Sequence, residues 1–470
     1  MLFSDIQKLL IDAKIEGNLN NKKLKYITDH SKDTNSNTLL VVDTKKNFKK
    51  IYLKKAITNG LNTIITNAYL ENCPITQIIV KDLNKNVFKL LKFRQAFKPL
   101  KSIAITGTNG KTSTTWYLKQ ILKYNNISTK LTGTLGYYKN LKKIKNSNLT
   151  TPSNLELYQF AYSNKKNNEV LISEASSHGL HQGRFNNLKI DIAAITNLSH
   201  DHLDYHKNFK SYTDSKILLF SKVLKDNGTA VINSRLKNFN YFKSKIKSRK
   251  LKIIIFGEKD IYFEQNKHLN LIINKKKYEI EKLKLNKIQI ENLECAIACA
   301  FAMNISPKNI IKNLNKLKSA PGRYEEIFYK KKSSKIIIDY AHTPDAIQNL
   351  LKTYSNKLIK PSLVFGCGGD RDRSKRKKMA IIANKYAKKV YLTDDNPRNE
   401  NPNLIRKTLK KYCPKAKEIS DRRLAIHTAI SEINDKDVLI IAGKGHEKYQ
   451  IIKNKKYLFD DYKVAKDFIK

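Results

Sequence analysis

The chain has 470 residues, and at roughly 150 residues a domain this length predicts about three domains. Its 40% hydrophobic and 9% aromatic content can fill hydrophobic cores, which argues against a disordered polymer. The formal net charge of +50 suggests nucleic-acid or membrane binding, but the lysines are spread evenly among many Asn and Ile residues and form no arginine-rich arm, so we interpret the charge as an A/T-rich codon bias.

Other whole-chain features point to a reduced, soluble protein in the cytoplasm. The five cysteines are odd in number and lack CxxC spacing, which argues against a disulfide framework and against structural zinc. No uninterrupted apolar run approaches the ~20 residues that cross a bilayer. The N-terminal stretch carries Asp5, Lys8 and Asp12 inside its apolar pattern, so residues 1–17 are predicted as an amphipathic helix and not a signal peptide.

The first 95 residues predict a small α/β domain. Short apolar runs of strand length occur at 38–42, 62–66 and 75–80, between charged segments. This region contains no strong catalytic motif. The lysine-rich stretches 139–146 and 274–284, further along the chain, are predicted as solvated loops and sheet edges.

Residues 96–325 predict a central α/β domain with a largely parallel sheet. The run "SIAIT" has strand length and leads through a Gly-containing loop into "TTWYLKQILKYN", where Tyr117, Ile121 and Tyr124 share one helical face. Further apolar runs, at 170–172 and 192–195, are followed directly by polar residues. Such alternation of strands and helices is typical of a parallel sheet.

Residues 326–470 repeat the alternation four times. Predicted strands lead into the polar motifs "YAHTP", "CGGDRD", "DDNPR" and "GKGHE", with predicted helices between them at 345–358, 377–388, 403–412 and 422–433. Ligands of open α/β sheets bind beyond the carboxyl ends of the strands. Four polar motifs at one rim therefore predict a binding site.

The stretch "TGTNGKTST", residues 106–114, lies between a predicted strand and a predicted helix. Backbone N–H groups around Gly107 and Gly110 can hold phosphate oxygens, Lys111 supplies positive charge, and Thr112 can ligate Mg²⁺. Ile105 stands where a phosphate loop usually has its first glycine. The alternative is a glycine-rich turn with an incidental lysine.

Two polar stretches follow the next strands. In "EASSHGLHQGR", Glu174 at a strand end is well placed to contact Mg²⁺ directly or through a neighbour. The stretch "NLSHDHLDYH", residues 197–206, carries three His and two Asp within seven residues. That composition also fits zinc, because imidazole suits Mg²⁺ less well than oxygen does, and the metal stays open on composition alone.

Seven motifs occur in one order: GTNGKT, ExSSHGLxQxR, DHLDYH, DYAHTPD, GCGGDRD, DNPR and GKGHE. Together they resemble the Mur ligase family, and within it the branch that adds the third amino acid to UDP-N-acetylmuramoyl-L-alanyl-D-glutamate. The resemblance runs from Lys101 to the C-terminus, whereas residues 1–95 match poorly.

The resemblance implies an α/β protein of three domains: a small N-terminal α/β domain for the UDP end, a central P-loop ATPase-like domain with a mostly parallel sheet, and a C-terminal Rossmann-like domain for the amino acid. It implies Mg²⁺ as cofactor and ATP as co-substrate, and a monomer that acts on small molecules. ATP would phosphorylate the D-Glu side-chain carboxylate, and an amine would attack the acyl phosphate. Phosphate is a good leaving group, so the enzyme's tasks are positioning and charge neutralisation.

The resemblance also assigns residues. Catalytic roles fall to Lys111, Glu174, His202 and Lys216, the last as a carbamate. The metal set is Thr112, Glu174, His202 and Lys216. The ATP set is Gly107, Thr108, Asn109, Gly110, Lys111, Thr112, Ser113, Asn292, Arg323 and Asp339. The UDP-muramoyl-dipeptide set is Ser31, Thr150, Thr151, Ser176, Gln182 and Arg184.

The remaining set implies a substrate preference. The family's DNPR marks enzymes that add meso-diaminopimelate. The distal centre of meso-diaminopimelate carries both a carboxylate and an ammonium, whereas lysine has no distal carboxylate. The planar fork of Arg398 suits that carboxylate, and Glu447 suits the ammonium. The full meso-diaminopimelate set is Arg371, Asp395, Asn396, Pro397, Arg398, Gly443 and Glu447.

Three departures and two alternatives accompany the resemblance. The family's Asp-Ser-Arg appears as His30-Ser31-Lys32, Leu149 stands where an Asn often precedes the threonines, and Gln289 replaces the first of two Asn.

A related ligase, for another amino acid or of the folylpolyglutamate type, is one alternative. A basic nucleotide-regulated nucleic-acid-binding protein, suggested by the charge alone, is the other.

Overall fold

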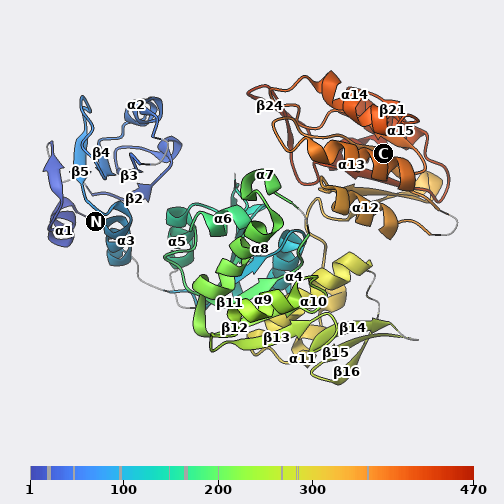
Figure 1. Ribbon diagram of the computed structural model, residues 1–470, viewed down its shortest axis with the longest axis horizontal. Coiled ribbons are helices and arrows are strands. Elements are labelled where there is room, and N and C mark those ends of the chain that lie inside the picture. Colours follow the sequence, from blue (N-terminus) through green and yellow to red (C-terminus); the bar gives the residue numbers. More distant parts are fainter. Residues whose placement is uncertain are drawn as a thin grey trace.

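The computed structural model describes the chain except for residues 1, 18–22, 46–47, 95–97, 148, 164–167, 200, 266–267, 282, 284 and 357–358. Three lobes follow one another along the chain, coloured blue, cyan through green to yellow, and orange to red in Figure 1, and each contains a large sheet of its own. The predicted three-domain α/β architecture is therefore confirmed. The exact domain boundaries, at residues 95 and 325, stay predictions.

The N-terminal lobe holds a five-stranded sheet in the order β1-β5-β4-β3-β2, parallel except for the β1–β5 pair. The three predicted apolar runs form β3, β4 and β5. The predicted N-terminal helix is wrong beyond Leu9, because Ile15 pairs instead with Ile78 of the sheet. The elements are α1 (Phe3–Leu9), β1 (Lys14–Glu16), β2 (Tyr26–Thr28), β3 (Thr38–Val42), α2 (Lys50–Thr58), β4 (Thr63–Thr66), β5 (Thr76–Ile79) and α3 (Leu83–Arg94).

The central lobe holds an eleven-stranded sheet in the order β16-β15-β14-β13-β12-β11-β6-β10-β7-β8-β9, in which β6 lies between two parallel partners, β10 and β11. Antiparallel hairpins close both ends. The strands are β6 (Lys101–Thr106), β7 (Ser128–Gly133), β8 (Gly136–Lys139), β9 (Lys142–Lys145), β10 (Glu169–Glu174), β11 (Ile190–Ile195), β12 (Leu224–Asn233), β13 (Lys252–Phe256), β14 (Ile261–Gln265), β15 (Leu269–Ile273) and β16 (Lys276–Ile280). The helices are α4 (Lys111–Tyr124), α5 (Asn154–Tyr162), α6 (Ser177–His181), α7 (Leu203–His206), α8 (Phe209–Leu218), α9 (Phe239–Ile246), α10 (Lys287–Ala302) and α11 (Pro307–Ile311).

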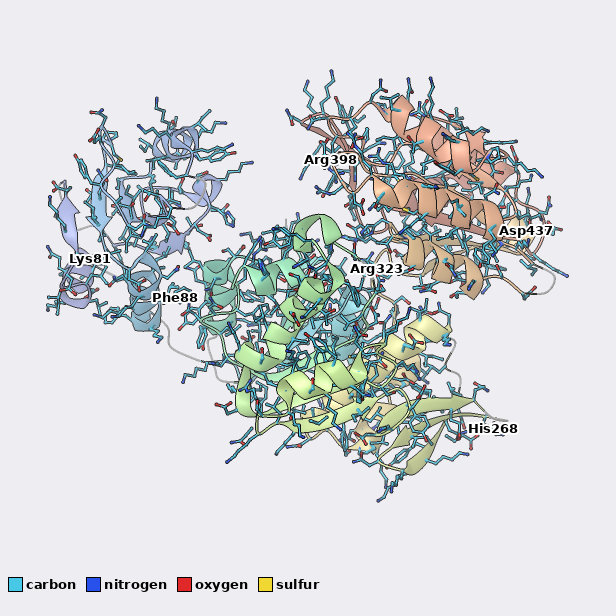
Figure 2. The ribbon with its side chains drawn as sticks, viewed as in Figure 1. Lys81, Phe88, His268, Arg323, Arg398 and Asp437 are labelled. Carbon is cyan, nitrogen blue, oxygen red and sulfur yellow. The ribbon has the colours of Figure 1, made fainter. Side chains whose placement is uncertain are left out.

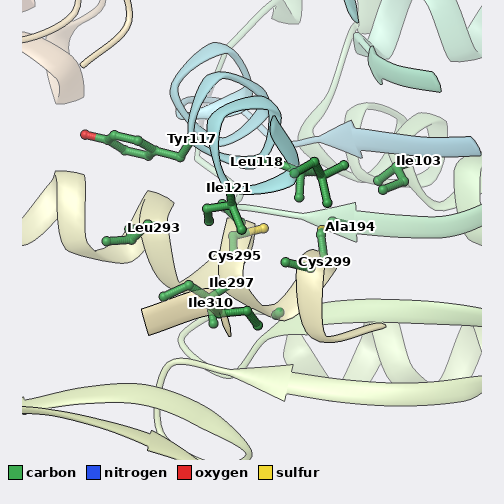
Figure 3. Close-up of a cluster of buried hydrophobic side chains, with 14 of the residues drawn as sticks. Ile103, Tyr117, Leu118, Ile121, Ala194, Leu293, Cys295, Ile297, Cys299 and Ile310 are labelled. Carbon is green, nitrogen blue, oxygen red and sulfur yellow. The ribbon is translucent and has the colours of Figure 1, made fainter. Parts of the chain in front are cut away.

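The central core explains why α4 sits where it does. Tyr117, Leu118 and Ile121 of α4 pack with Leu293 and Ile297 of α10 in one buried cluster (Figure 3). Burial of each large aliphatic side chain contributes about 1.5–3 kcal/mol, so this apolar face fixes α4 against the sheet. The predicted third member of the face, Tyr124, is instead 36% exposed at the helix end.

The C-terminal lobe holds a six-stranded sheet in the order β17-β18-β22-β19-β20-β21, with only the β17–β18 pair antiparallel. The four predicted strands form β18, β22, β19 and β20, so their polar motifs meet at one edge, as predicted. The elements are β17 (Glu325–Tyr329), β18 (Ser334–Asp339), α12 (Pro344–Thr353), β19 (Ser362–Phe365), α13 (Ser374–Tyr386), β20 (Val390–Leu392), α14 (Pro402–Tyr412), β21 (Lys417–Glu418), α15 (Arg422–Ser431), β22 (Val438–Ala442), β23 (Tyr449–Ile452), β24 (Lys455–Leu458) and α16 (Asp461–Phe468).

Local sequence signals start several helices. Asn286 and Gln289 form a reciprocal capping box at the start of α10, with each side chain accepting from the other's backbone N–H at 2.9 and 3.0 Å. Gln289, which departs from the family pattern, therefore caps this helix. Proline occupies the first turn of α12 and α14, where its missing N–H costs no helical hydrogen bond.

The N-terminal and central lobes are joined by contacts of α5. Phe88 of α3, labelled in Figure 2, meets Tyr158 edge to face with ring centroids 4.9 Å apart. Gln159 donates to the Ile27 carbonyl at 2.7 Å, and His30 lies 3.7 Å from the Glu156 carboxylate. His30, which replaces the family's Asp, thus reaches across to the central lobe.

Across the part of the chain that the structure describes, no helix is long and apolar enough to cross a membrane.

Candidate active site

The loop between β6 and α4 requires glycine at two positions. Gly107 and Gly110 have φ of 144° and 85°, and a Cβ on them would lie 1.9 Å from Thr196 Oγ1 and 2.1 Å from Asn292 Oδ1. The backbone therefore approaches its neighbours more closely than any side chain permits. Asn292 of α10 is thereby brought beside the loop, as predicted. The loop ends at the N-terminus of α4, where free N–H groups favour anions.

Two lysines converge on one carbonyl of this loop. Lys111 Nζ donates to the carbonyls of Gly107 at 2.8 Å and Thr108 at 2.9 Å, and Lys216 Nζ donates to Gly107 at 2.9 Å. Burial lowers the pKa of Lys111, and burial followed by the charge of Lys111 lowers the pKa of Lys216 well below its usual range. Asp201 opposes both shifts. The site therefore brings two amines to one carbonyl of the loop, where phosphates would bind.

Glu174 lies at the end of β10 and is 1% exposed. Its carboxylate accepts from Thr112 Oγ1 at 2.9 Å, from Thr134 Oγ1 at 3.0 Å and from Thr134 N at 2.9 Å. Burial raises the pKa of Glu174, while Lys111 opposes that shift. Gly133 leaves the room for this carboxylate, since a Cβ there would lie 2.1 Å from Glu174 Oε1.

These oxygens fit a magnesium ion. Thr112 and Glu174 supply hard oxygen donors side by side, which Mg²⁺ prefers, and Mg²⁺ commonly completes its shell with substrate phosphates and water. Among the described residues, no group of three or more His, Cys, Asp or Glu is arranged to hold a metal. His200, one of the residues behind the zinc alternative, lies outside them.

The other histidines form a cluster beside the loop. His202 has a positive φ of 53° and its Nε2 lies 3.4 Å from Asp201 Oδ2. Its ring centroid lies 4.8 Å from that of His178. His206 is buried, and burial followed by His178 lowers its pKa to about 4. The predicted catalytic His202 is thus held near Asp201, which itself lies near Lys111 and Lys216.

The residues predicted to hold the UDP-muramoyl-dipeptide lie together. Thr151 Oγ1 donates to the Glu174 carbonyl at 2.8 Å and lies 3.1 Å from Ser176 Oγ, while Thr134 Oγ1 lies 3.2 Å from Thr150 Oγ1. Arg184 donates to the Thr151 carbonyl and to Gln182 Oε1, both at 2.5 Å.

A cavity of about 860 Å³ between the N-terminal and central lobes extends this group. Ser31 lines it from the N-terminal lobe, and Gln182 and Arg184 line it from the central lobe. The structure therefore brings Ser31 to the same cavity as residues more than 150 positions away. Leu149, a departure from the family pattern, is 43% exposed.

The central and C-terminal lobes meet around Tyr340. Figure 2 labels Arg323 near this junction; its guanidinium carbon lies 4.3 Å from the Tyr340 ring centroid. Asp339 accepts from the backbone N–H groups of Tyr324 and Ala341, each at 2.8 Å, so its carboxylate organises the turn that carries Arg323. Burial and then Lys375 lower the pKa of His342 to about 4, whereas Asp201 of the central lobe opposes that shift. The motifs of the two lobes thus face one another.

The C-terminal polar motifs bring charged side chains together at one edge of the sheet, and we refer to these residues as the C-terminal pocket. Arg398, labelled in Figure 2, has φ of 51° and donates from Nη1 to the Gly369 carbonyl at 2.8 Å. A Cβ on Gly368 would lie 2.8 Å from Arg398 Nη1 and 3.9 Å from Arg371 Cγ, so the two arginines border this glycine. Gly369 likewise has no space for a Cβ, which would lie 1.9 Å from the Pro397 carbonyl oxygen.

Two carboxylates, Glu447 and Asp395, belong to the same group of residues. Asn396 Nδ2 donates to Glu447 Oε2 at 2.8 Å. Gly443 has φ of 112°, and a Cβ on it would lie 2.5 Å from the carboxylate of the buried Asp395. Asn396 therefore links Glu447 to the motif that carries Arg398, and Gly443 leaves the room that Asp395 occupies.

Sequence reasoning missed Thr134, Asp201, Tyr212 and Lys444. Asp201 and Lys444 stand inside motifs that the sequence displays, so their positions carried a signal. Thr134 and Tyr212 stand in no recognisable motif; Tyr212 OH lies 2.9 Å from Thr108 Oγ1 and anchors the phosphate-loop residue. Only the three-dimensional contacts identify these two.

Comparisons with known proteins agree with this arrangement. Residues 105–302 match the Mur ligase middle domain, and residues 322–445 match the Mur ligase glutamate ligase domain. A UDP-N-acetylmuramoyl-L-alanyl-D-glutamate–2,6-diaminopimelate ligase of Rickettsia conorii is 35% identical over 436 residues, 89% of this chain and 90% of the relative. The enzyme of that name from Fusobacterium nucleatum is 36% identical over 431 residues, 88% of this chain and 87% of the relative.

Solved structures are similar along the whole chain. A structure of a UDP-N-acetylmuramoyl-L-alanyl-D-glutamate–2,6-diaminopimelate ligase is 30% identical with a TM-score of 0.63, covering 100% of this chain and 98% of that one. A UDP-N-acetylmuramoylalanyl-D-glutamyl-2,6-diaminopimelate–D-alanyl-D-alanyl ligase from Acinetobacter baumannii is 16% identical with a TM-score of 0.69, covering 99% and 97%. The second likeness concerns the fold alone.

Proposed function

The chain belongs to the Mur ligase family, and we propose that it joins meso-diaminopimelate to the D-Glu side-chain carboxylate of UDP-N-acetylmuramoyl-L-Ala-D-Glu in an ATP-dependent amide ligation. This reaction makes a peptidoglycan precursor. The observation that carries the proposal is the charge layout of the C-terminal pocket: Arg371 and Arg398 border Gly368, and Glu447 lies across Asn396. The two arginines suit the distal carboxylate of meso-diaminopimelate, and Glu447 suits its distal ammonium.

The first step transfers the γ-phosphoryl group of ATP to the D-Glu carboxylate. The backbone around Gly107 and Gly110 would bind phosphate oxygens, and Lys111 would exchange its two backbone carbonyls for the transferred group. The carboxylate oxygen forms a bond to phosphorus as the bond to ADP breaks. Asn292, beside Gly110, and Arg323, at the junction of the lobes, support binding of the rest of the nucleotide.

Mg²⁺, when bound, would neutralise charge on the phosphate oxygens, and Thr112 and Glu174 are the residues that fit it. We further propose that Lys216 carries a carbamate. Its neutral amine would attack CO₂, forming a C–N bond and releasing one proton. The carbamate would be a carboxylate-like group that could help to hold Mg²⁺. The depressed pKa of Lys216 supports this, because only the neutral amine reacts.

The second step joins the amino acid. The amine of meso-diaminopimelate attacks the acyl phosphate, a C–N bond forms, the C–O bond to phosphate breaks, and the amine loses a proton. The C-terminal pocket would orient that amine by holding the distal centre, which is how positioning lowers the barrier. The cavity between the N-terminal and central lobes, with Ser31, Gln182 and Arg184, would hold the UDP-muramoyl end.

The proposal extends to the protein's setting. We infer that it works as a monomer in the cytoplasm on small-molecule substrates and binds neither nucleic acid nor membrane. The related ligases that add another amino acid or glutamyl groups to folates remain the second candidate. The arginines that border the pocket favour meso-diaminopimelate over both.

One assay tests the proposed function. Purified protein is incubated with ATP, Mg²⁺, UDP-muramoyl-dipeptide and a panel of amino acids that includes meso-diaminopimelate, L-lysine and glutamate, and the products are read by mass. We expect a tripeptide product with meso-diaminopimelate and release of ADP. Equal use of L-lysine would contradict the assigned amino acid, and absence of every product would contradict the activity.

A phosphate-loop variant belongs in the same assay. Lys111→Ala removes a cation from the phosphoryl group in transit, and loss of one such contact commonly costs ~10²-fold or more in rate. Lys123→Ala, near the other end of α4, is the matched control and is expected to keep full activity. Near-normal turnover of Lys111→Ala would mean that the loop does not bind ATP as proposed.

A further inference from the structure

Lys444 is a buried lysine in the C-terminal pocket. It follows β22 between Gly443 and Gly445 and is 0% exposed. Its Nζ donates to Asn396 Oδ1 at 3.1 Å and lies 3.5 Å from Glu447 Oε2. Lysine is almost never fully buried unless it is paired, so these two contacts account for its position.

Asn396 transmits the effect of Lys444. Its Oδ1 accepts from two donors, Lys444 Nζ and the backbone N–H of Ile451 at 2.8 Å. Two donors on the oxygen force the amide nitrogen to the opposite side, where it donates to Glu447 Oε2 at 2.8 Å. The side-chain amide thus has one permitted orientation, and that orientation supports Glu447.

Asn396 and Lys444 hold the Glu447 side chain through one of its two carboxylate oxygens. Within the described residues, the contacts from Asn396 and Lys444 both fall on Oε2. Neither Asn396 nor Lys444 donates to Oε1, so Oε1 can accept a hydrogen bond from a ligand. Arg422, another buried cation of this lobe, is paired with Asp461 at 2.8 and 2.7 Å, whereas Lys444 Nζ lies 3.5 Å from Glu447 Oε2.

We propose that Lys444 is a positioning residue for the distal ammonium of the amino-acid substrate: with Asn396 it holds Glu447 so that Oε1 points at that ammonium. The proposal rests on the proposed function, because it deepens the amino-acid site of that ligase. Lys444 does not touch the substrate. It acts by fixing a carboxylate whose partner is the ammonium, whereas Arg371 and Arg398 serve the distal carboxylate.

The experiment compares two substrates that differ only in the group that Glu447 reads. L-2-aminopimelate keeps the distal carboxylate of meso-diaminopimelate and lacks the distal amine. Lys444→Met preserves the length and fills the buried space without charge. We expect Lys444→Met to raise the KM for meso-diaminopimelate roughly 10- to 100-fold, the range for a hydrogen bond to a charged group, and to leave the KM for L-2-aminopimelate unchanged.

The KM for ATP and the kcat with either amino acid should stay near those of the unmodified enzyme. Lys448→Met is the matched control, because Lys448 lies on the same loop with its side chain 79% exposed; it should change neither KM. If Lys444→Met does not fold, Lys444→Gln keeps a neutral donor to Asn396 and must still lower the preference for meso-diaminopimelate.

Equal losses with the two amino acids would overturn the proposal, because a role that is only structural would not distinguish them. An unmodified enzyme that ligates neither amino acid would instead refute the proposed function. The two failures are therefore distinguishable.

Discussion

Buried lysines are the unusual single residues of this protein. Among the described residues, Lys119, Lys130, Lys216 and Lys444 are 4% exposed or less. Burying an ammonium is costly unless it is paired or neutral. Lys130 and Lys444 have carboxylate partners, at 3.7 and 3.5 Å. Lys216 instead lies near a second cation, Lys111, which favours its neutral form.

The first residue-scale prediction concerns Lys216. Lys216→Ala should lose most ligase activity, and bicarbonate or a short-chain carboxylate should restore part of it by occupying the space left. Labelled bicarbonate should give a carbamate signal in the unmodified protein that Lys216→Ala lacks. Lys210→Ala, on the exposed side of the same helix, should behave as the unmodified enzyme. Full activity of Lys216→Arg, which keeps the charge and cannot form the adduct, would rule the carbamate out.

The second residue-scale prediction concerns Arg398. Lysine offers no distal carboxylate, so binding it would leave the guanidinium desolvated and without a partner, a penalty of roughly 10²-fold or more. Arg398→Ala should therefore abolish the preference for meso-diaminopimelate over L-lysine, measured as the ratio of kcat/KM values. Arg423→Ala, an exposed arginine on α15, should keep that ratio. A ratio unchanged by Arg398→Ala would assign the carboxylate to another residue.

The candidate site was predictable where chemistry and motif coincide. Lys111, Glu174 and Arg398 stand in motifs whose residue types match their contacts. Lys444 stands in a displayed motif, yet only the distances to Asn396 and Glu447 show what it holds. Thr134, directly after β7, contacts Glu174 at the end of the neighbouring strand β10. No motif marks Thr134, and its contact depends on strand order and not on sequence spacing.

At the scale of elements, helix α4 carries Lys119, a buried lysine without a carboxylate partner among the described residues. Lys119 Nζ lies 3.3 Å from the Trp116 ring centroid and 4.3 Å from that of Tyr138, and it has no hydrogen-bond partner within the described residues. Burial lowers the pKa of Lys119 to about 7. The aromatic rings stabilise its charged form only in part, as cation–π contacts contribute about 0.5–2 kcal/mol.

The element-scale prediction follows from the sign of that shift. An unfolded lysine keeps its proton up to about pH 10.4, so between pH 7 and that value the unfolded chain binds more protons and stability rises with pH. Below pH 7 Lys119 is protonated in the folded protein too, and burial of its charge lowers the stability by the full amount. Lys119→Met should therefore stabilise the central lobe by roughly 2–4 kcal/mol at pH 7, and the gain should shrink toward pH 10.

Thermal unfolding of both proteins at several pH values measures this difference. Lys123→Met, an exposed lysine one turn further along α4, is the control and should show no pH-dependent gain. A Lys119→Met variant that is less stable than its parent at pH 7 would show that the cation–π contacts outweigh the burial.

Elements were predictable where periodicity is strong. The helices α13, α14 and α15 of the C-terminal lobe lie within about three residues of their predicted bounds, since each apolar run is bounded by polar motifs or proline. The helix predicted over 345–358 ends instead at Thr353, and residues 357–358 lie outside the described residues. The N-terminal helix was overextended, because the run around Ile15 is short enough to suit either structure and tertiary pairing with Ile78 decides it. Register and strand order depend on distant partners, and no local pattern carries them.

At the scale of the whole molecule, two lysine-rich stretches lie at the edges of the central sheet. The lysine-rich stretches 139–146 and 274–284 overlap the edge strands β9 and β16, as expected for solvated edges, and charged edges discourage pairing with other chains. The phosphate loop lies instead at β6, in the interior of the sheet. These two lysine-rich stretches therefore lie away from the strand that leads into the loop around Gly107 and Gly110.

The requirements for ATP turnover distinguish the proposed ligase from the nucleic-acid alternative. A chain of +50 attracts polyanions at low salt, but such binding falls steeply as salt rises and needs no specific site. ATP turnover requires an acceptor carboxylate beside Lys111 and an amine beside the acyl phosphate. We therefore expect phosphate release to be low with ATP alone, to rise strongly when UDP-muramoyl-dipeptide and meso-diaminopimelate are both present, and to be unaffected by RNA or DNA at physiological salt. The measurement is phosphate release with each component omitted in turn, and Lys111→Ala gives the background. Turnover that RNA or DNA stimulated without the two co-substrates would favour the nucleic-acid-binding class.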